Sequence, residues 1–276
     1  MTDYRLSLVL DNIHDRASLT ATSERPGAPV DYTQRNERNR VWRSTGTSTQ
    51  VIEGTLGAGT YADTVAIIGH NLTSAGTLRI EWLNGSSIIR DSGEIATGEI
   101  IPAGVWRAGI DPYQATYNDR LQVPGRLVTF EPAPITGYRI TLDDPSNPAG
   151  ALQVARIVTG LAFRPAFNMS YGVQTTWVDP ATHERSAGQT LRTIGGGNPR
   201  RRVQFALDWL LPGDRERLIE EIAEIGMIRD VYVDLYPDRT GIERLSGQFV
   251  GRLTEGYGDT HDHYRNYTST ITITEV

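Results

Sequence analysis

The sequence predicts a mainly β protein: an N-terminal β-sandwich followed by a second β-sandwich that is flanked by one α-helix. Short apolar or alternating segments recur along the 276 residues, separated by turns that contain many of the 28 glycines and 14 prolines. Only the segment after Pro212 keeps a helical period long enough for an α-helix. The character of the segments changes near Phe163-Arg164-Pro165, which predicts two domains, residues 1–165 and 166–276.

The composition excludes several classes of function. The chain has no cysteine, so disulfides, thiol nucleophiles and zinc-thiolate sites are ruled out. All 27 basic residues are arginine, which removes lysine Schiff-base chemistry and P-loop lysines. A net charge of -6 argues against sequence-specific nucleic-acid binding. With no signal peptide and no apolar run of membrane-spanning length, we expect a soluble protein.

In the first half we expect nine short strands, whose turn-separated spacing is typical of a β-sandwich. The apolar run at 65–68 predicts a fully buried strand, and Leu78, Ile80 and Trp82 alternate on one face of the next. These two strands are expected to pair as a hairpin. The nine expected strands are residues 4–10, 17–22, 40–44, 50–56, 63–68, 77–82, 126–131, 137–142 and 154–162.

This strand pair, with Gly69-His70-Asn71-Leu72 as its turn, resembles the galactose-binding-like jelly rolls of phage tail proteins. Residues 138–144, an aromatic-Arg-Ile-Thr strand, lead through a polar loop to a strand at 154–160, which resembles the discoidin-type pattern. The resemblance covers most of residues 1–165 and implies loops at one end that bind glycans or lipids in many members. It carries over no individual sugar-binding residue.

The long insert at residues 95–123 contains Trp106, Tyr113 and Tyr117 among Gly, Pro and Asp. An insert of this length is typical of a functional loop or of a loop packed on a neighbouring surface. The three aromatic side chains are therefore candidates for stacking on sugar rings. The alternative is that they anchor the loop on its own domain or on another subunit.

The second half opens with a long hairpin, expected at residues 167–192, which is either an ordinary hairpin or an arm that reaches another subunit. A strand follows at 199–210, where Val203, Phe205, Leu207 and Trp209 share one face by alternation. The helix is expected to start with Asp214 as N-cap and to stop at Gly226. Its apolar stripe comprises Leu218, Ile219, Ile222 and Ile225, and further strands are expected at 231–236, 245–253 and 268–274.

This order of elements resembles the ring-forming domain shared by phage tail-tube, distal-tail and related tail-tip proteins. The resemblance covers residues 166–276 and implies a homo-oligomeric ring. The residues assigned to the core or assembly of the ring domain are Trp177, Phe205, Trp209, Leu218 and Ile222.

A search for catalytic, metal and cofactor sites yields none. His261 and His263 lie on one face of an extended segment but lack a third ligand nearby, so a solvated loop is expected. Asp143, Asp144 and Asn147 fit either a calcium loop or ordinary turn chemistry. The clusters at 200–202 and at 35, 38, 40 and 43 are expected to form ion pairs between subunits. No nucleophile elbow organises a triad, so we expect no enzyme and no cofactor.

We therefore expect a structural virion protein of the tail tip, distal tail or baseplate, assembled in the host cytoplasm. It would form a ring that connects the tail tube to the adsorption apparatus, with tube, hub, fibre or spike proteins as partners. The alternative is a carbohydrate-binding module protein that attaches to a host glycan. A hydrolase is a third, more distant interpretation.

Overall fold

The computed structural model describes residues 5–37, 39–73, 75–97, 125–196, 199–239, 244 and 246–276. Among these, contacts group residues 7–163 and 232–249 into a first unit, and residues 5–6, 164–231 and 250–276 into a second. The prediction of a mainly β fold with one α-helix is confirmed. Contacts alone do not show which segments fold independently, so the predicted domains, 1–165 and 166–276, stay a prediction.

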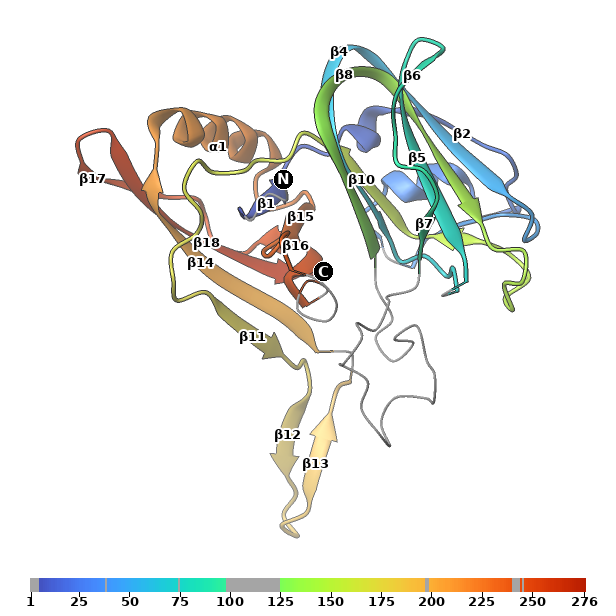
Figure 1. The fold of residues 1–276 in the computed structure, drawn as a ribbon. Helices are drawn as coiled ribbons and strands as arrows, with labels where there is room; N and C mark the ends of the chain where they lie inside the picture. Colours follow the sequence, from blue (N-terminus) through green and yellow to red (C-terminus); the bar gives the residue numbers. More distant parts are fainter. Residues whose placement is uncertain are drawn as a thin grey trace, which may run out of the picture. The chain divides into compact units, whose positions relative to one another are not determined.

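The first unit is built on a sheet of strand order β10-β4-β8-β5-β6, with β2 beside β4 and β7 beside β5 (Figure 1). Two shorter pairs, β3 with β9 and β1 with β15, complete its strands. The strands are β1 (Ser7–Val9), β2 (Ser18–Ala21), β3 (Trp42–Arg43), β4 (Gln50–Ile68), β5 (Thr77–Asn84), β6 (Ser87–Asp91), β7 (Ile95–Ala96), β8 (Gly125–Asp143), β9 (Gln153–Val154), β10 (Arg156–Gly160) and β15 (Val231–Asp234). Two 3-10 helices, η1 (Ile13–Arg16) and η2 (Val30–Gln34), lie between the first strands.

Strands β4 and β8 are both 19 residues long and pair along their length, arching over one end of the unit (Figure 1). The first half of β4 pairs with β2 and its second half with β10, while β5 pairs with the second half of β8. Register shifts between Thr55 and Thr60 and between Ala62 and Thr64 accompany the bend. Both halves of β4 contribute to one hydrophobic core, through Ile52 and Ile67 for example, so the two layers form a β-sandwich.

The expected hairpin between residues 63–68 and 77–82 is wrong. Residues 65–68 are buried as expected, but β4 and β5 do not pair, because β8 lies between them in the sheet. The expected strands at 50–56 and 63–68 are one continuous strand, as are those at 126–131 and 137–142. A bulge lets a strand bend without ending, and the glycines at 57 and 59 carry no apolar signal that would reveal the continuity.

The second unit contains a sheet of order β16-β18-β14-β11, with β17 beside β18. The helix α1 contacts β18, and Leu218, Ile222 and Ile225 are buried as expected, whereas Ile219, the fourth residue of the expected stripe, is only half-buried. The elements are β11 (Gln174–Val178), β12 (Thr182–Arg185), β13 (Leu191–Ile194), β14 (Arg200–Leu210), α1 (Pro212–Ile225), β16 (Gln248–Leu253), β17 (Asp259–His263) and β18 (Asn266–Glu275).

The predicted N-cap of the helix is wrong. Leu211 occupies the N-cap position and Pro212 the first turn, where its missing N–H is not needed. The Asp214 carboxylate instead accepts a hydrogen bond from the backbone of Ala166, at 2.8 Å. The predicted stop at Gly226 is confirmed, because its N–H donates to the Ile222 carbonyl and its φ is +56°.

The strict alternation expected along β14 fails at its end. Val203, Phe205 and Leu207 are buried, but Trp209 is 59% exposed and Leu210 is buried in its place. The register of β14 against β18 shifts between Leu207 and Leu210, which turns Trp209 outward. Trp209 is therefore a surface residue rather than a core residue.

The expected long hairpin at 167–192 is present in extended form. Strand β11 pairs with β14, and β12 pairs with β13, so the hairpin runs from the sheet into a projecting two-stranded arm (Figure 1). Every residue of β11, β12 and β13 is exposed.

Candidate functional site

One end of the first unit gathers four loops, at residues 44–49, 69–76, 92–97 and 144–153. Asn71 ties two of them together, because its side chain donates to the Ala151 carbonyl and accepts from the Gln153 N–H, each at 2.8 Å. Ser44 connects a third loop, since its N–H donates to the Leu152 carbonyl at 3.0 Å. We call this set of loops the loop end. Loops fixed in this way on a rigid sandwich are suited to positioning side chains for binding.

Asp144 is the centre of the hydrogen bonding at the loop end. Its buried carboxylate accepts from the N–H and hydroxyl of Thr73 and from the Asn147 amide, at 2.7 to 3.1 Å. Thr97 donates to the Thr73 and Gly76 carbonyls. The Asp144 oxygens are thus occupied by protein donors, which favours the turn interpretation of residues 143–147 over the calcium interpretation.

His70 presents polar groups that this network does not use. The residue is partly buried, and both its ring nitrogens are shielded from solvent without a hydrogen-bond partner. Burial and the nearby Arg126 guanidinium lower the pKa of His70 to about 4, so the imidazole is neutral at pH 7. A neutral imidazole offers one donor and one acceptor, and leaving both unpaired costs free energy that a ligand with hydroxyl groups would recover.

The segment that contains Trp106, Tyr113 and Tyr117 lies outside the described residues. Of the two described residues that flank it, Thr97 bonds to Gly76 within the loop end, and Gly125, the first residue of β8, pairs with Ile68 just before the loop that begins at residue 69. The three predicted aromatic contacts therefore stay predictions.

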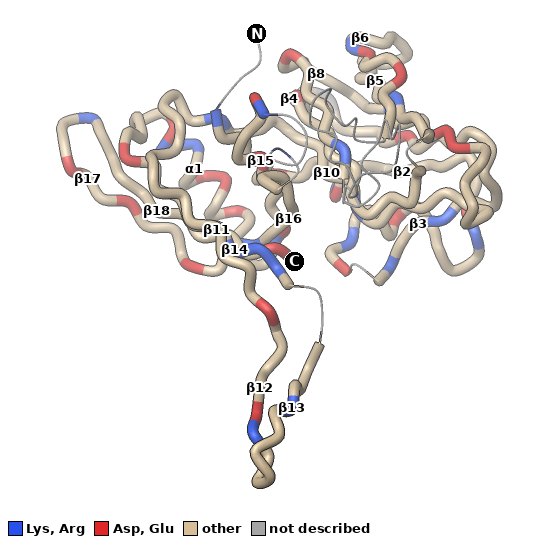
Figure 2. The backbone as a smooth tube through the Cα atoms, turned by 60° about the horizontal axis from the view of Figure 1, so that its bottom comes forward, with Lys and Arg blue, Asp and Glu red and all other residues tan. Residues whose placement is uncertain are grey.

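A second polar feature adjoins the loop end. Strand β3 pairs with β9, and the Arg43 guanidinium donates to the Gln153 side chain at 2.9 Å. The Arg25 N–H donates to the Arg43 carbonyl at 2.8 Å, so the turn at 25–28 lies beside β3. Arg35 and Arg40 lie over the ring of Tyr32, at 5.9 and 5.5 Å from its centroid. Figure 2 shows basic residues around β3.

Three of the clustered arginines have carboxylate partners within the chain, and ion pairs of the other clustered arginines with another subunit stay a prediction. Arg201 is buried and binds Glu275, at 2.6 Å, and Arg202 binds Glu255 at 2.8 Å. Arg40 pairs with Glu37 at 3.3 Å, and Arg38 lies outside the described residues. Carboxylates distant in sequence supply partners that local patterns do not reveal.

His261 and His263 lie on the exposed strand β17 rather than in the expected loop. The His261 ring stacks on Tyr267, with centroids 4.6 Å apart. Over the described ranges, no three His, Asp or Glu side chains gather in a way that would hold a metal ion. No helix in that same part of the chain is both long and apolar enough to cross a bilayer.

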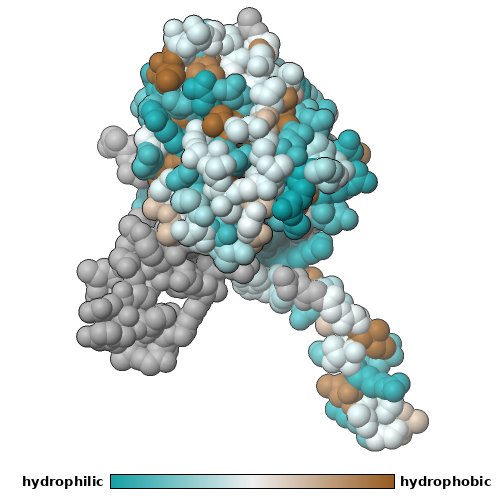
Figure 3. All heavy atoms as spheres, turned by 90° about the vertical axis from the view of Figure 1, so that its right-hand side faces the viewer, coloured by the Kyte–Doolittle hydropathy of each residue, from teal (hydrophilic) through white to brown (hydrophobic). Residues whose placement is uncertain are grey.

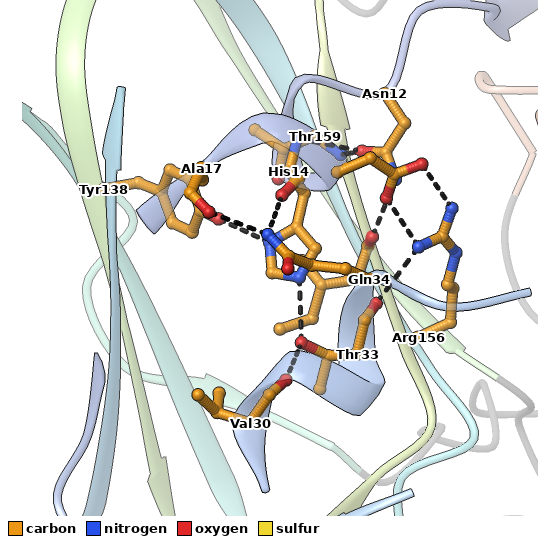
Figure 4. Close-up of polar contacts among 11 residues, drawn as sticks. Asn12, His14, Ala17, Val30, Thr33, Gln34, Tyr138, Arg156 and Thr159 are labelled. Carbon is orange, nitrogen blue, oxygen red and sulfur yellow. Dashed lines mark hydrogen bonds and ion pairs between the residues drawn. The ribbon is translucent and has the colours of Figure 1, made fainter. Parts of the chain in front are cut away.

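The core of the first unit contains a buried polar cluster that the sequence did not predict (Figure 4). His14 hydrogen-bonds through Nδ1 to the Tyr138 hydroxyl and through Nε2 to Thr33 Oγ1, and the Arg156 guanidinium binds the Asp15 carboxylate at 2.6 and 2.8 Å. Burial, with the Arg156 charge, holds the pKa of His14 well below its usual value. His14, Thr33, Tyr138 and Arg156 are almost wholly shielded from solvent, so this cluster joins η1, η2, β8 and β10 rather than meeting a ligand.

No protein-family model and no curated protein matches this chain. Among solved structures, it is similar to the family 32 carbohydrate-binding module of Clostridium perfringens NanJ, determined with galactose. The identity is 16% over 56% of this chain and 98% of that chain, at a TM-score of 0.38. It is also similar to a chitosan-binding module of a chitosanase/glucanase from Paenibacillus sp. IK-5, with 13% identity over 54% of this chain and 98% of that chain, at a TM-score of 0.37. A third similar structure is a Streptococcus pneumoniae fucose-binding module, with 10% identity over 54% of this chain and 94% of that chain, at a TM-score of 0.39. The expected likeness to phage tail proteins stays a prediction.

Proposed function

We propose that the protein binds carbohydrate through the loop end of its first unit and acts in attachment to a glycan-bearing surface, without catalysing a reaction. The observation that carries the proposal is His70, a neutral imidazole with two unpaired ring nitrogens, next to Asn71, whose side chain is hydrogen-bonded to the neighbouring loop. Sugars present many hydroxyl groups, each of which both donates and accepts a hydrogen bond, and this matches what His70 offers.

The loop framework is held by hydrogen bonds of its own, so a ligand has to uncover only the shielded ring nitrogens of His70. Asn71, Asp144 and Asn147 hold the loops through buried hydrogen bonds, so little conformational entropy is lost when a ligand binds. Trp106 and Tyr113 are expected to add stacking against the apolar face of a sugar ring.

The test is a glycan array, followed by calorimetric titration, with the full chain. The array includes galactose, fucose, chitosan oligomers and uronic acids. We expect binding in the wild type, at least tenfold weaker binding in His70→Ala, and loss of binding in Trp106→Ala or Tyr113→Ala. His183→Ala is the matched control, because His183 lies exposed on β12. Absence of binding to every glycan would overturn the proposal.

A second candidate function is assembly into a homo-oligomeric ring of a phage tail tip, with the virion as its location. The observation that favours it is the arm β12–β13, which is exposed throughout and bears Leu191 and Ile194, 55% and 50% exposed. Figure 3 shows hydrophobic residues along the arm. A native mass that is a whole-number multiple of 30.5 kDa would support a ring. A monomer, or a C-terminal label that never localises to purified tails, would argue against it.

A further inference from the structure

The arginine surface beside the loop end is defined by Arg25, Arg35, Arg40 and Arg43, all of which are exposed. These four basic residues lie on a chain whose net charge is -6. Within the described residues, no carboxylate pairs with Arg25, Arg35 or Arg43. These three guanidinium groups therefore carry charge that the protein itself does not neutralise.

The nearby acidic residues are bound to other groups in the described part of the chain. Glu24 accepts a hydrogen bond from the Val30 N–H at 3.0 Å, and Glu37 is paired with Arg40. Asp143 accepts from the Thr49 hydroxyl at 2.6 Å. A carboxylate that accepts from a neutral donor keeps its charge, but none of the three forms an ion pair with Arg25, Arg35 or Arg43, so these guanidinium groups can bind a carboxylate of a ligand.

The backbone fixes the positions of the arginines. The turn at 25–28 closes with the Ala28 N–H on the Arg25 carbonyl at 2.9 Å, and Gly27 has the positive φ of +81° that this turn requires. Arg43 is held by β3 and by Gln153, whose own N–H bonds to Asn71 beside His70. The arginine surface and the loop end are therefore continuous through Gln153.

We infer that the carbohydrate ligand is anionic, a polysaccharide whose sugar rings carry carboxylates, with one sugar ring at the loop end and the carboxylates of neighbouring rings on the arginine surface. This inference rests on the proposed function and names its ligand class. The planar guanidinium matches a carboxylate through two parallel hydrogen bonds, and it stays charged at every working pH. Nucleic acid is the alternative polyanion, and the test below includes double-stranded DNA for that reason.

The test compares two tetrasaccharides of the same linkage, one of galacturonic acid and one of galactose, titrated into the full chain. We expect the acidic tetramer to bind at least tenfold more tightly than the neutral one, and its affinity to fall as salt rises. The double variant Arg25→Gln/Arg43→Gln should lose about tenfold in affinity for the acidic tetramer only. Arg35→Gln serves as a second variant if the double variant does not fold. Arg90→Gln is the control, because Arg90 is exposed on β6 and hydrogen-bonds to the Ile89 carbonyl rather than to a carboxylate among the described residues.

Equal affinity for the two tetramers would overturn the inference while leaving the proposed function intact. An acidic tetramer bound equally by wild type and by the double variant would also overturn it, as would tighter binding of random-sequence double-stranded DNA than of the acidic tetramer. If neither tetramer binds and the glycan array is also empty, the proposed function itself fails.

Discussion

His70 gives the first unit a stability that depends on pH. Its pKa is lowered from 6.5 to about 4 in the folded protein, so the unfolded chain binds the proton first as the pH falls. The stability contributed by the neutral form is complete above pH 6.5 and is lost progressively down to pH 4. His14 is shifted in the same direction and adds to this loss.

We therefore expect the free energy of unfolding to fall between pH 7 and pH 4.5, and to fall less in His70→Asn. The difference attributable to His70 is at most about 3 kcal/mol, at about 1.4 kcal/mol for each pKa unit. Urea unfolding at the two pH values measures it. The control is His183→Asn, which should keep the wild-type pH dependence. An identical pH dependence in His70→Asn and wild type would contradict the role of His70.

Gly54 tests how tightly the core around Tyr138 is packed. A Cβ at residue 54 would meet the Tyr138 ring, which is fully buried and held by His14 and by the edge of Trp82. We expect Gly54→Ala to lower the free energy of unfolding by about 2 kcal/mol. Gly57→Ala, on the same strand and with open space at its Cβ, should lose less than about 1 kcal/mol. Equal losses of unfolding free energy in the two variants would show that the Tyr138 ring moves to make room for the new methyl group.

Single residues also mark the limit of what the sequence predicts. The apolar stripe of α1 and the burial of residues 65–68 follow from spacing alone and are confirmed. Asp214 is not the N-cap, because its carboxylate binds the Ala166 N–H instead. Trp209 points outward because the register of β14 against β18 shifts after Leu207. His70 was identified as part of a turn, but its unpaired nitrogens depend on which groups surround it, and spacing does not reveal that.

At the scale of elements, the 3-10 helix η1 is tied to β10 by one ion pair. The Arg156 guanidinium is 1% exposed and binds Asp15, whereas Arg16 of the same helix binds Asp11 at the surface. Removing the partner of a buried charge leaves it unpaired, which costs far more than the loss of a surface pair.

We expect Asp15→Asn to lower the free energy of unfolding by about 3 kcal/mol and Asp11→Asn by less than about 1 kcal/mol. Chemical denaturation of the two variants measures the difference. Similar losses in both would show that water reaches Arg156. The pattern Asn-Ile-His-Asp at 12–15 gave no strand or helix period, so neither η1 nor this ion pair was predicted.

At the scale of the whole molecule, the arm β12–β13 bears on assembly. A two-stranded hairpin with both faces in water is marginal by itself, and a partner that covers it would stabilise it. We expect Leu191→Ser/Ile194→Ser to leave the unfolding transition unchanged and to shift any oligomer toward 30.5 kDa in sedimentation. Ile88→Ser on β6, 49% exposed, is the control. An oligomer that survives in the arm variant would place the interface elsewhere.

The two layers of the first unit share their longest strands, since β4 and β8 run through both. Unfolding of either layer would therefore disrupt β4 and β8, which the other layer also contains. Neither layer can unfold while the other stays folded. This makes the sandwich a single cooperative unit, which keeps the loop end rigid. Cleavage of the peptide chain inside β4 should therefore unfold both layers of the sandwich in one cooperative transition.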